Sequence, residues 1–192
     1  EQEMFLVDSS MHPACVVMQI LENAKDGRLT TEIGQFNLEA NLTPLEFSGN
    51  ALSQLENEIL EVVDIVRQNA KKVDSDVVLT GILPTIQHSD LVIENITPSP
   101  RYYELNRVLT ELHGENRLVH IKGLDELNLT LQDALSETCN TSFQIHLQVG
   151  NKDFVNAYNW AQAVAAPVLA CAVNSPMLFG LESSFWLSSS LF

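Results

Sequence analysis

Oxygen-bearing side chains recur at every second position in three separate stretches of this chain. Residues 1–7, 31–44 and 138–149 each alternate polar and apolar side chains, which is the period of a β-strand with one face in a core. The polar positions carry carboxylates and amides, with one imidazole among them. They are Glu1, Glu3, Glu32, Asn37, Glu39, Gln144 and His146. If the three strands are neighbours, these side chains gather on one face of a sheet.

Carboxylates that gather on one face repel one another, and protonation, water or cations relieve the repulsion. Oxygen ligands with a single imidazole suit Mg²⁺ or Mn²⁺ and suit a structural zinc poorly. A face that holds such ions is a platform for nucleotide phosphates, because the metal stabilises charge on the transferring phosphoryl group. The sequence therefore predicts a site for divalent cations and nucleotide phosphates.

The stretch 31–44 decides how many of these side chains can act together. Read as a strand, it sends one set of residues to a core and the other set to the polar face. The two sets are Phe36, Leu38, Ala40 and Leu42, and Gln35, Asn37, Glu39 and Asn41. Glu32 and Glu39 differ in parity, so an unbroken strand would turn them to opposite faces. We expect a break in register at Gly34, which tolerates a bulge. In a regular strand, one of the two glutamates is not a ligand.

Familiar phosphate-binding and catalytic motifs are absent from the sequence. A glycine-rich cradle of the GxxxxGK[ST] or GxGxxG type is missing, so metal must neutralise the phosphates. A GxSxG elbow, an HExxH helix and a CxxC pair are missing as well. Their absence excludes the commonest serine hydrolases, zinc proteases and redox folds.

The charge of the chain limits its expected binding partners, and its cysteines indicate the cellular compartment. The 192 residues include 25 acidic and 10 basic side chains, for a formal net charge of −15. Proteins bind nucleic acid largely through Lys and Arg, which neutralise the phosphates, so nucleic acid is not an expected partner of this acidic chain. An anionic membrane surface is not expected as a partner either. Cys15, Cys139 and Cys171 are widely spaced, which predicts reduced thiols in a cytoplasmic protein. The uncharged run 161–181 contains two prolines and several polar residues, so it predicts a buried helix and a turn rather than a membrane span.

Helical and strand patterns follow one another irregularly along the chain. Helical spacing of apolar residues predicts helices at about 13–25, 48–72, 101–113 and 154–169, the last of them packed tightly against the sheet. Strands are expected at 1–7, 31–44, 76–79, 118–121, 127–131 and 138–149. The long connection over 80–100 is expected to carry function. Two-faced strands without regular strand-helix alternation predict an α+β fold, with an antiparallel sheet and helices packed on one face.

Six segments occur in the order seen in one enzyme family. They are EQEMFLVD, TTEIGQFNLEANLTP, TGILPT, ITPSPRYYELN, CNTSFQIHLQV and AVNSPMLFG. In this order the chain resembles the carboxylate-amine ligases of the glutamate-cysteine ligase type 2 group over nearly all of residues 1–180. It departs from the family pattern at its tail, which lacks an Arg-rich segment.

The resemblance implies a glutamine synthetase-like core, in which a curved antiparallel sheet holds metal and ATP. It implies that ATP phosphorylates a glutamate-like carboxylate and that an amine then displaces the phosphate, with Mg²⁺ or Mn²⁺ as the cation. The implied metal ligands are Glu1, Glu3, Glu32, Glu39 and His146, with Asn37 as an alternative in the second strand. Gln144 and His146 are implied to contact the nucleotide. Asn37, Arg101, Tyr102 and Asn174 are implied to lie on the substrate side.

Two other functions compete with an active ligase. The chain could keep the fold and bind nucleotide and metal without turnover, or the polar faces could be ordinary solvated surfaces of an acidic scaffold protein. We expect residues 1–180 to form a single ligase-like catalytic domain that is incomplete in this sequence, and 181–192 to be a tail of joined fragments. A homo-oligomer is compatible with the sequence.

Overall fold

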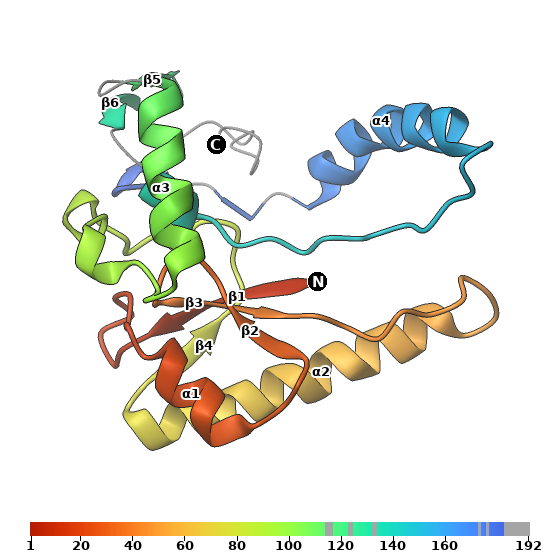
Figure 1. Ribbon diagram of the computed structural model, residues 1–192, viewed down its shortest axis with the longest axis horizontal. Helices are drawn as coiled ribbons and strands as arrows, with labels where there is room; N and C mark the ends of the chain where they lie inside the picture. Colours follow the sequence, from red (N-terminus) through yellow and green to blue (C-terminus); the bar gives the residue numbers. More distant parts are fainter. Residues whose placement is uncertain (114–116, 123–124, 132–133, 173, 176, 183–192) are drawn as a thin grey trace.

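A computed structural model describes residues 1–113, 117–122, 125–131, 134–172, 174–175 and 177–182 (Figure 1). Its strands are β1 (Gln2–Val7), β2 (Leu29–Thr31), β3 (Asn37–Ala40), β4 (Asp76–Val78), β5 (Arg117–Lys122), β6 (Glu126–Leu131), β7 (Met177–Leu178) and β8 (Leu181–Glu182). Its α-helices are α1 (Val17–Ala24), α2 (Ala51–Ala70), α3 (Pro100–His113) and α4 (Phe154–Cys171). Short 3₁₀ helices span η1 (Lys71–Val73), η2 (His88–Asp90), η3 (Ile93–Asn95) and η4 (Ala134–Cys139). The predicted mixture of helices and antiparallel sheets is confirmed.

The central sheet has the strand order β2-β3-β1-β4, and every neighbouring pair is antiparallel. Its register places Glu3 opposite Glu39 across β1 and β3, and Thr30 opposite Glu39 across β2 and β3. Because side chains alternate between faces, residues paired in this way share a face. The strands predicted at 1–7, 76–79, 118–121 and 127–131 are confirmed, and the last two pair with each other as β5 and β6.

One face of the central sheet is apolar and covered by helices. Met4, Leu6 and Leu38 point to this face and are fully buried. They pack with Ile20 of α1 and Val66 of α2 in one hydrophobic cluster, and Figure 1 shows both helices on the same side of the sheet. Each such side chain stabilises the fold by about 1.5–3 kcal/mol when fully buried. The apolar side chains that alternate in residues 1–7 therefore form part of the core, as predicted.

The opposite face is divided into an apolar half and a polar half. Phe5 and Val7 of β1 are buried there against Ile82, Leu83 and residues of the loop that follows β4. Glu3 and Glu39 lie on the same face, toward the other end of β1 and β3. The fold therefore leaves a limited polar area beside a packed cluster.

The predicted single strand over 31–44 is wrong, because the structure has two strands and a turn. β2 ends at Thr31 and β3 begins at Asn37, and the two strands pair with each other. Gly34 lies in the turn, where an added Cβ would come within 2.4 Å of Asn37 Oδ1. The chain reverses there, so Phe36 packs with Phe5 instead of with Leu38 and Ala40.

The predicted strand over 138–149 is also wrong. Residues up to Cys139 belong to η4, and 140–149 contain two isolated bridges, Asn140 to Ile82 and Phe143 to Gln2, instead of a strand. The expected core side chains Phe143, Ile145 and Leu147 are 46%, 69% and 57% exposed. Alternating side chains do not form a core face unless a second layer covers them, and no described element does so here.

The helix predicted at 154–169 forms as α4, but its predicted packing against the sheet is wrong. None of its residues is buried, and Figure 1 shows it standing apart from the central sheet. The helices predicted at 13–25, 48–72 and 101–113 form as α1, α2 and α3 with shifts of a few residues at their ends. Among the described residues, no helix combines the length and the apolar character needed to cross a membrane.

Candidate functional site

Three carboxylates meet on the polar half of the sheet. Glu3 comes from β1, Glu39 from β3, and Glu32 directly follows β2. One carboxylate oxygen of each lies within 4.8 Å of the others. The β2–β3 turn brings Glu32 and Glu39 together, because Thr30 faces Glu39 and Glu32 is two residues beyond Thr30. The predicted break in register near Gly34 is confirmed, although a turn rather than a bulge produces it.

Glu32 is the most perturbed acid of this cluster. Burial raises the pKa of Glu32 to about 7, and a hydrogen bond with Glu39 and the charges of Glu39 and Glu3 act in the same direction. The backbone N–H of Ile33 donates to Glu32 Oε2 at 3.1 Å and opposes the shift. Glu32 therefore keeps its proton to a higher pH than an ordinary glutamate does.

A buried segment behind the cluster fixes the backbone that carries Glu32. Thr97 Oγ1 donates to the carbonyl oxygen of Glu32 at 2.6 Å, and the Thr97 N–H donates to Ile33 at 2.8 Å. Tyr102 Oη donates to the carbonyl oxygen of Thr31 at 2.7 Å. Thr97 and Tyr102 are only 2% and 8% exposed. Thr97 and Tyr102 thus hold the three consecutive carbonyl groups of residues 31–33. Thr97 lies in the long connection that was predicted to carry function, and Tyr102 lies just after it.

Glu3 and Glu39 are fixed by neutral donors. Glu3 accepts hydrogen bonds from the Ser142 N–H at 2.8 Å and from Gln144 Nε2 at 2.6 Å. Glu39 accepts one from Asn41 Nδ2 at 2.6 Å. These contacts orient the carboxylates without neutralising them, so the cluster remains a site of concentrated negative charge.

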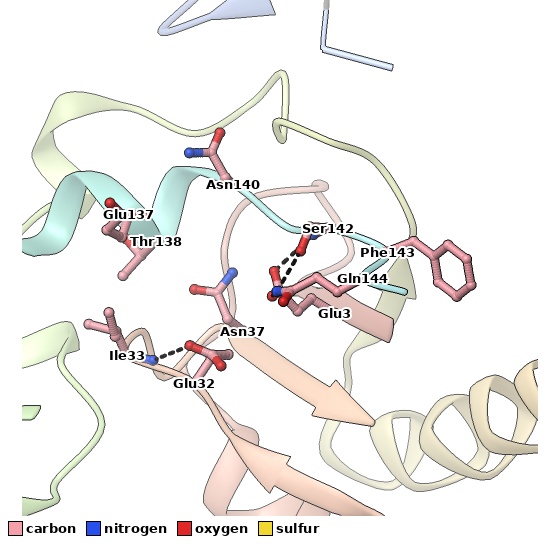
Figure 2. Close-up of a pocket in the computed structure, with 10 residues that line it drawn as sticks. All are labelled: Glu3, Glu32, Ile33, Asn37, Glu137, Thr138, Asn140, Ser142, Phe143 and Gln144. Atoms are coloured by element: carbon pink, nitrogen blue, oxygen red, sulfur yellow. Dashed lines mark hydrogen bonds between the residues drawn. The ribbon is translucent and has the colours of Figure 1, made fainter. Parts of the chain in front are cut away.

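A pocket of about 320 Å³ opens beside the carboxylates. Figure 2 shows Glu3, Glu32 and Asn37 on its sheet side, with residues of η4 and the following segment forming the opposite wall. Gln144 belongs to this wall, so β1 and the segment after η4 meet at the pocket as predicted. The volume lies at the lower end of the range of roughly 300–1,000 Å³ that is common for small-molecule sites.

Two amide side chains in the pocket wall lack hydrogen-bond partners. Asn37 is 2% exposed, and both its Oδ1 and its Nδ2 are unpaired. Nδ2 of Asn140 is also buried and unpaired, and these three are the only such side-chain atoms in the described part of the chain. An unpaired buried polar group costs about 1–3 kcal/mol. The free protein therefore carries a cost here that a bound group could remove.

The residues present fit a hard divalent cation. Three carboxylates and the carboxamide of Asn37 supply oxygen atoms, which Mg²⁺ and Mn²⁺ prefer. A cation would offset the charges of Glu39 and Glu3, which add to the effect of burial in raising the pKa of Glu32. The unpaired amide of Asn37 is an observation separate from the acidic cluster and agrees with a missing partner at this point.

The other predicted site residues lie outside the pocket wall. His146 Nε2 is 3.3 Å from Glu1 Oε1, and the His146 side chain is 65% exposed. Arg101 is exposed on α3, with its guanidinium carbon 5.7 Å from the ring centre of Tyr102. Asn174 is exposed, and its carbonyl oxygen accepts a hydrogen bond from the Gly81 N–H. The structure therefore brings together Glu3, Glu32, Glu39, Asn37 and Gln144 and leaves these residues apart from them.

Asn140 and Ser142 both line the pocket, and neither was predicted as a site residue, although Ser142 belongs to the polar face of the strand predicted over 138–149. Of the polar face of that strand, only Gln144 and His146 were predicted to lie in the site. The unbroken polar run from Asn140 to Ser142 was the available signal, because three consecutive polar residues do not fit a two-faced strand.

The fold and the site define an α+β protein whose central antiparallel sheet presents a cluster of three carboxylates beside a pocket of about 320 Å³. Residues 1–189 match the family model described as glutamate-cysteine ligase family 2 (GCS2). The chain belongs to this family, which agrees with the resemblance found in the sequence and indicates a function of the carboxylate-amine ligase type. Searches of curated proteins and of solved structures returned no match.

Proposed function

We propose that the protein is an ATP-dependent carboxylate-amine ligase that joins a glutamate-like carboxylate to an amine through an acyl-phosphate. The observation that carries the proposal is the cluster of Glu3, Glu32 and Glu39 beside a pocket of about 320 Å³. Membership of the family supports a ligase in general. We further propose that the central sheet corresponds to the curved sheet of a glutamine synthetase-like core.

The proposed reaction has two steps. A carboxylate oxygen of the first substrate attacks the γ-phosphorus of ATP, and the bond from that phosphorus to the ADP oxygen breaks. The nitrogen of the amine then attacks the acyl carbon, inorganic phosphate leaves, and the nitrogen loses a proton. The products are an amide, ADP and phosphate, so atoms and charge balance.

In this proposal, Glu3, Glu32 and Glu39 hold the divalent cation. A cation bound there stabilises negative charge on phosphoryl oxygens. Ser142 and Gln144 hold Glu3 in position, and Thr97 and Tyr102 hold the backbone at Glu32. Glu32 must release its proton when the cation binds, because its raised pKa leaves it partly protonated at neutral pH.

Glu1 and His146 lie beside the start of β1, where His146 is proposed to contact the nucleotide and Glu1 to bind a cation at the edge of the site. Arg101 is not assigned to the substrate carboxylate, because it lies on exposed α3 and outside the pocket wall. The wall contains no Lys or Arg among the residues that the structure describes. A substrate carboxylate is therefore proposed to meet a bound cation and neutral hydrogen-bond donors instead.

An ADP-release assay with Mg²⁺-ATP, L-glutamate and a panel of amines tests this function. Adding hydroxylamine as the amine would trap the acyl-phosphate as a hydroxamate, which identifies the intermediate directly. We expect ADP release that requires both substrates and is lost in Glu39→Gln. Nucleotide binding without turnover would favour the binding module. Weak Mn²⁺ binding that is equal in the parent and in Glu39→Gln would favour the acidic scaffold.

A further inference from the structure

The unpaired amide atoms of Asn37 and Asn140 specify the chemistry of a partner. Both side chains line the same pocket, Asn37 from β3 and Asn140 from the segment after η4 (Figure 2). Native proteins pair nearly all buried polar groups, so unpaired ones beside a cavity indicate a bound group. An amide Nδ2 can only donate a hydrogen bond, and an amide Oδ1 can only accept one or bind a cation. The missing partner must therefore satisfy donors and an acceptor together.

A cation accompanied by its anion meets both requirements. Amide oxygens are suitable ligands for hard divalent cations, and carboxylate or phosphoryl oxygens accept strong hydrogen bonds from N–H groups. The oxygen of Asn37 is a suitable further ligand for a cation held by Glu3, Glu32 and Glu39, and its nitrogen can donate to the anion. Asn140 offers a second nitrogen from the opposite wall.

We propose that Asn37 and Asn140 form a subsite that binds an oxyanion oxygen, from either a carboxylate or a phosphoryl group, together with the divalent cation of the acidic cluster. The cation in this inference rests on the proposed function. The added claim concerns specificity, since these two amides select an anionic ligand and couple its binding to that of the cation.

The charges of the pocket require this coupling. Glu3, Glu32 and Glu137 all contribute to its wall, and no basic side chain does so among the described residues. A bare anion would be repelled by these carboxylates. Once a cation is bound, neutral amide donors add hydrogen bonds to the anion without forming ion pairs that would draw the carboxylates away from the metal. Anion binding should therefore be measurable only when the cation is present.

The local backbone keeps Asn37 in the position that the subsite needs. Its Oδ1 lies against Gly34, where an added Cβ would come within 2.4 Å of it and within 3.0 Å of Thr138 Cγ2. The turn and η4 thus confine the carboxamide without giving it a hydrogen bond. This arrangement fits a ligand-binding role better than a structural one, because a structural amide would be paired within the protein.

Calorimetric titration of the full chain saturated with Mn²⁺ tests the subsite, with orthophosphate, ATP and L-glutamate as separate probes. The variants are Asn140→Ala, the nearly isosteric Asn140→Asp and the volume-conserving Asn37→Leu. Asn57→Ala, which removes an exposed amide from α2, is the matched control. The melting temperature of each variant without ligand reports any structural role.

We expect Asn140→Ala to weaken the anionic probe by about 10- to 100-fold, the usual effect of losing a hydrogen bond to a charged group. Its Mn²⁺ affinity should stay within about twofold, and its ligand-free melting temperature should not fall, because Nδ2 of Asn140 makes no hydrogen bond in the free protein. If Asn140→Ala loses affinity for phosphate and ATP, the ligand of the subsite is a phosphoryl group. If it loses affinity for glutamate, the ligand is a carboxylate. Asn57→Ala should match the parent.

Two results would overturn the subsite. One is unchanged affinity for all three probes in both Asn140 variants. The other is a ligand-free melting temperature that falls by more than about 4 °C in Asn140→Ala, which would show that the amide is paired within the protein. Failure of the ligase function gives a different result: cation-dependent anion binding that needs Asn140, without ADP release in the turnover assay. Conversely, turnover with unchanged KM values in Asn140→Ala would leave the ligase standing and remove the subsite.

Discussion

Glu3 and Glu39 lie directly opposite each other on neighbouring antiparallel strands, and both face the same side of the sheet. Like charges in directly opposite positions destabilise a sheet. Here Glu32 adds a third carboxylate, and one oxygen of each lies within 4.8 Å of the others. A cation that binds between these carboxylates should therefore stabilise the folded protein.

Replacing Glu39 with Gln keeps the shape of the side chain and removes one charge from the cluster. We expect Mn²⁺ affinity to fall at least tenfold, because one of three close carboxylates is lost. Titration followed by electron paramagnetic resonance of free Mn²⁺ measures this change. Glu46→Gln, at an exposed position outside the cluster, should bind Mn²⁺ like the parent. Equal losses in both variants would mean that only overall charge matters.

Cation affinity should depend on pH through Glu32. Its pKa is raised to about 7, so a proton competes with the cation below that value. We expect Mn²⁺ affinity to rise about tenfold per pH unit between pH 5 and 7 and to level off above pH 7. Glu32→Gln should remove this dependence while lowering affinity. A slope that survives in Glu32→Gln would assign the proton to another group.

The same shift predicts how stability without cations changes with pH. The folded state binds the Glu32 proton more tightly than the unfolded chain, whose pKa is near 4.5, so stability falls as pH rises from about 4.5 to 7. The full effect is at most about 3 kcal/mol. Glu32→Gln should therefore raise the midpoint of urea unfolding at pH 8 relative to the parent, with a smaller difference at pH 4.5. A larger gain at pH 4.5 would contradict the direction of the shift.

Tyr102 and Thr97 should act on cation binding through the backbone at Glu32. Tyr102→Phe removes the hydrogen bond to Thr31, and Thr97→Val removes the one to Glu32. We expect about 1 kcal/mol of lost stability for each variant and a roughly 10-fold loss of Mn²⁺ affinity. Thr97→Ser keeps the hydroxyl and should restore Mn²⁺ affinity. Tyr103→Phe is the control, because Tyr103 is 45% exposed. Stability loss with unchanged Mn²⁺ affinity would limit these residues to a structural role.

Gly34→Ala should disturb Asn37 before it disturbs the sheet. The new Cβ would collide with Asn37 Oδ1 and crowd Thr138, so the carboxamide or the turn must move. We expect a loss of about 1–3 kcal/mol in the free energy of unfolding and weaker anion binding. Gly27→Ala, where an added Cβ would meet nothing within 4 Å, is the control for unfolding. Chemical denaturation together with the calorimetric titration measures both effects.

The sequence alone was sufficient wherever a pattern is set by neighbours along the chain. Alternation in residues 1–7 predicted the buried face of β1, and helical spacing predicted α1, α2 and α3, because each pattern reflects which side of one element meets the core. Ordered motifs also indicated the family before any geometry was known. Both Glu3 and Glu39 were found in this way.

Tertiary structure decided which of these residues meet. Glu32 and Glu39 share a face because the chain reverses between Thr31 and Asn37, and no local pattern separates that turn from a bulged strand. Alternation correctly predicted which side chains of residues 1–7 are buried, but the apolar side chains that it predicted to be buried after Ser142 are exposed. A buried face needs a covering layer, and the sequence of one segment does not specify that layer. Asn140 joined Asn37 through contacts between segments about a hundred residues apart in the chain. Such contacts depend on how separate elements pack, and that is why the pocket could be recognised only in the folded protein.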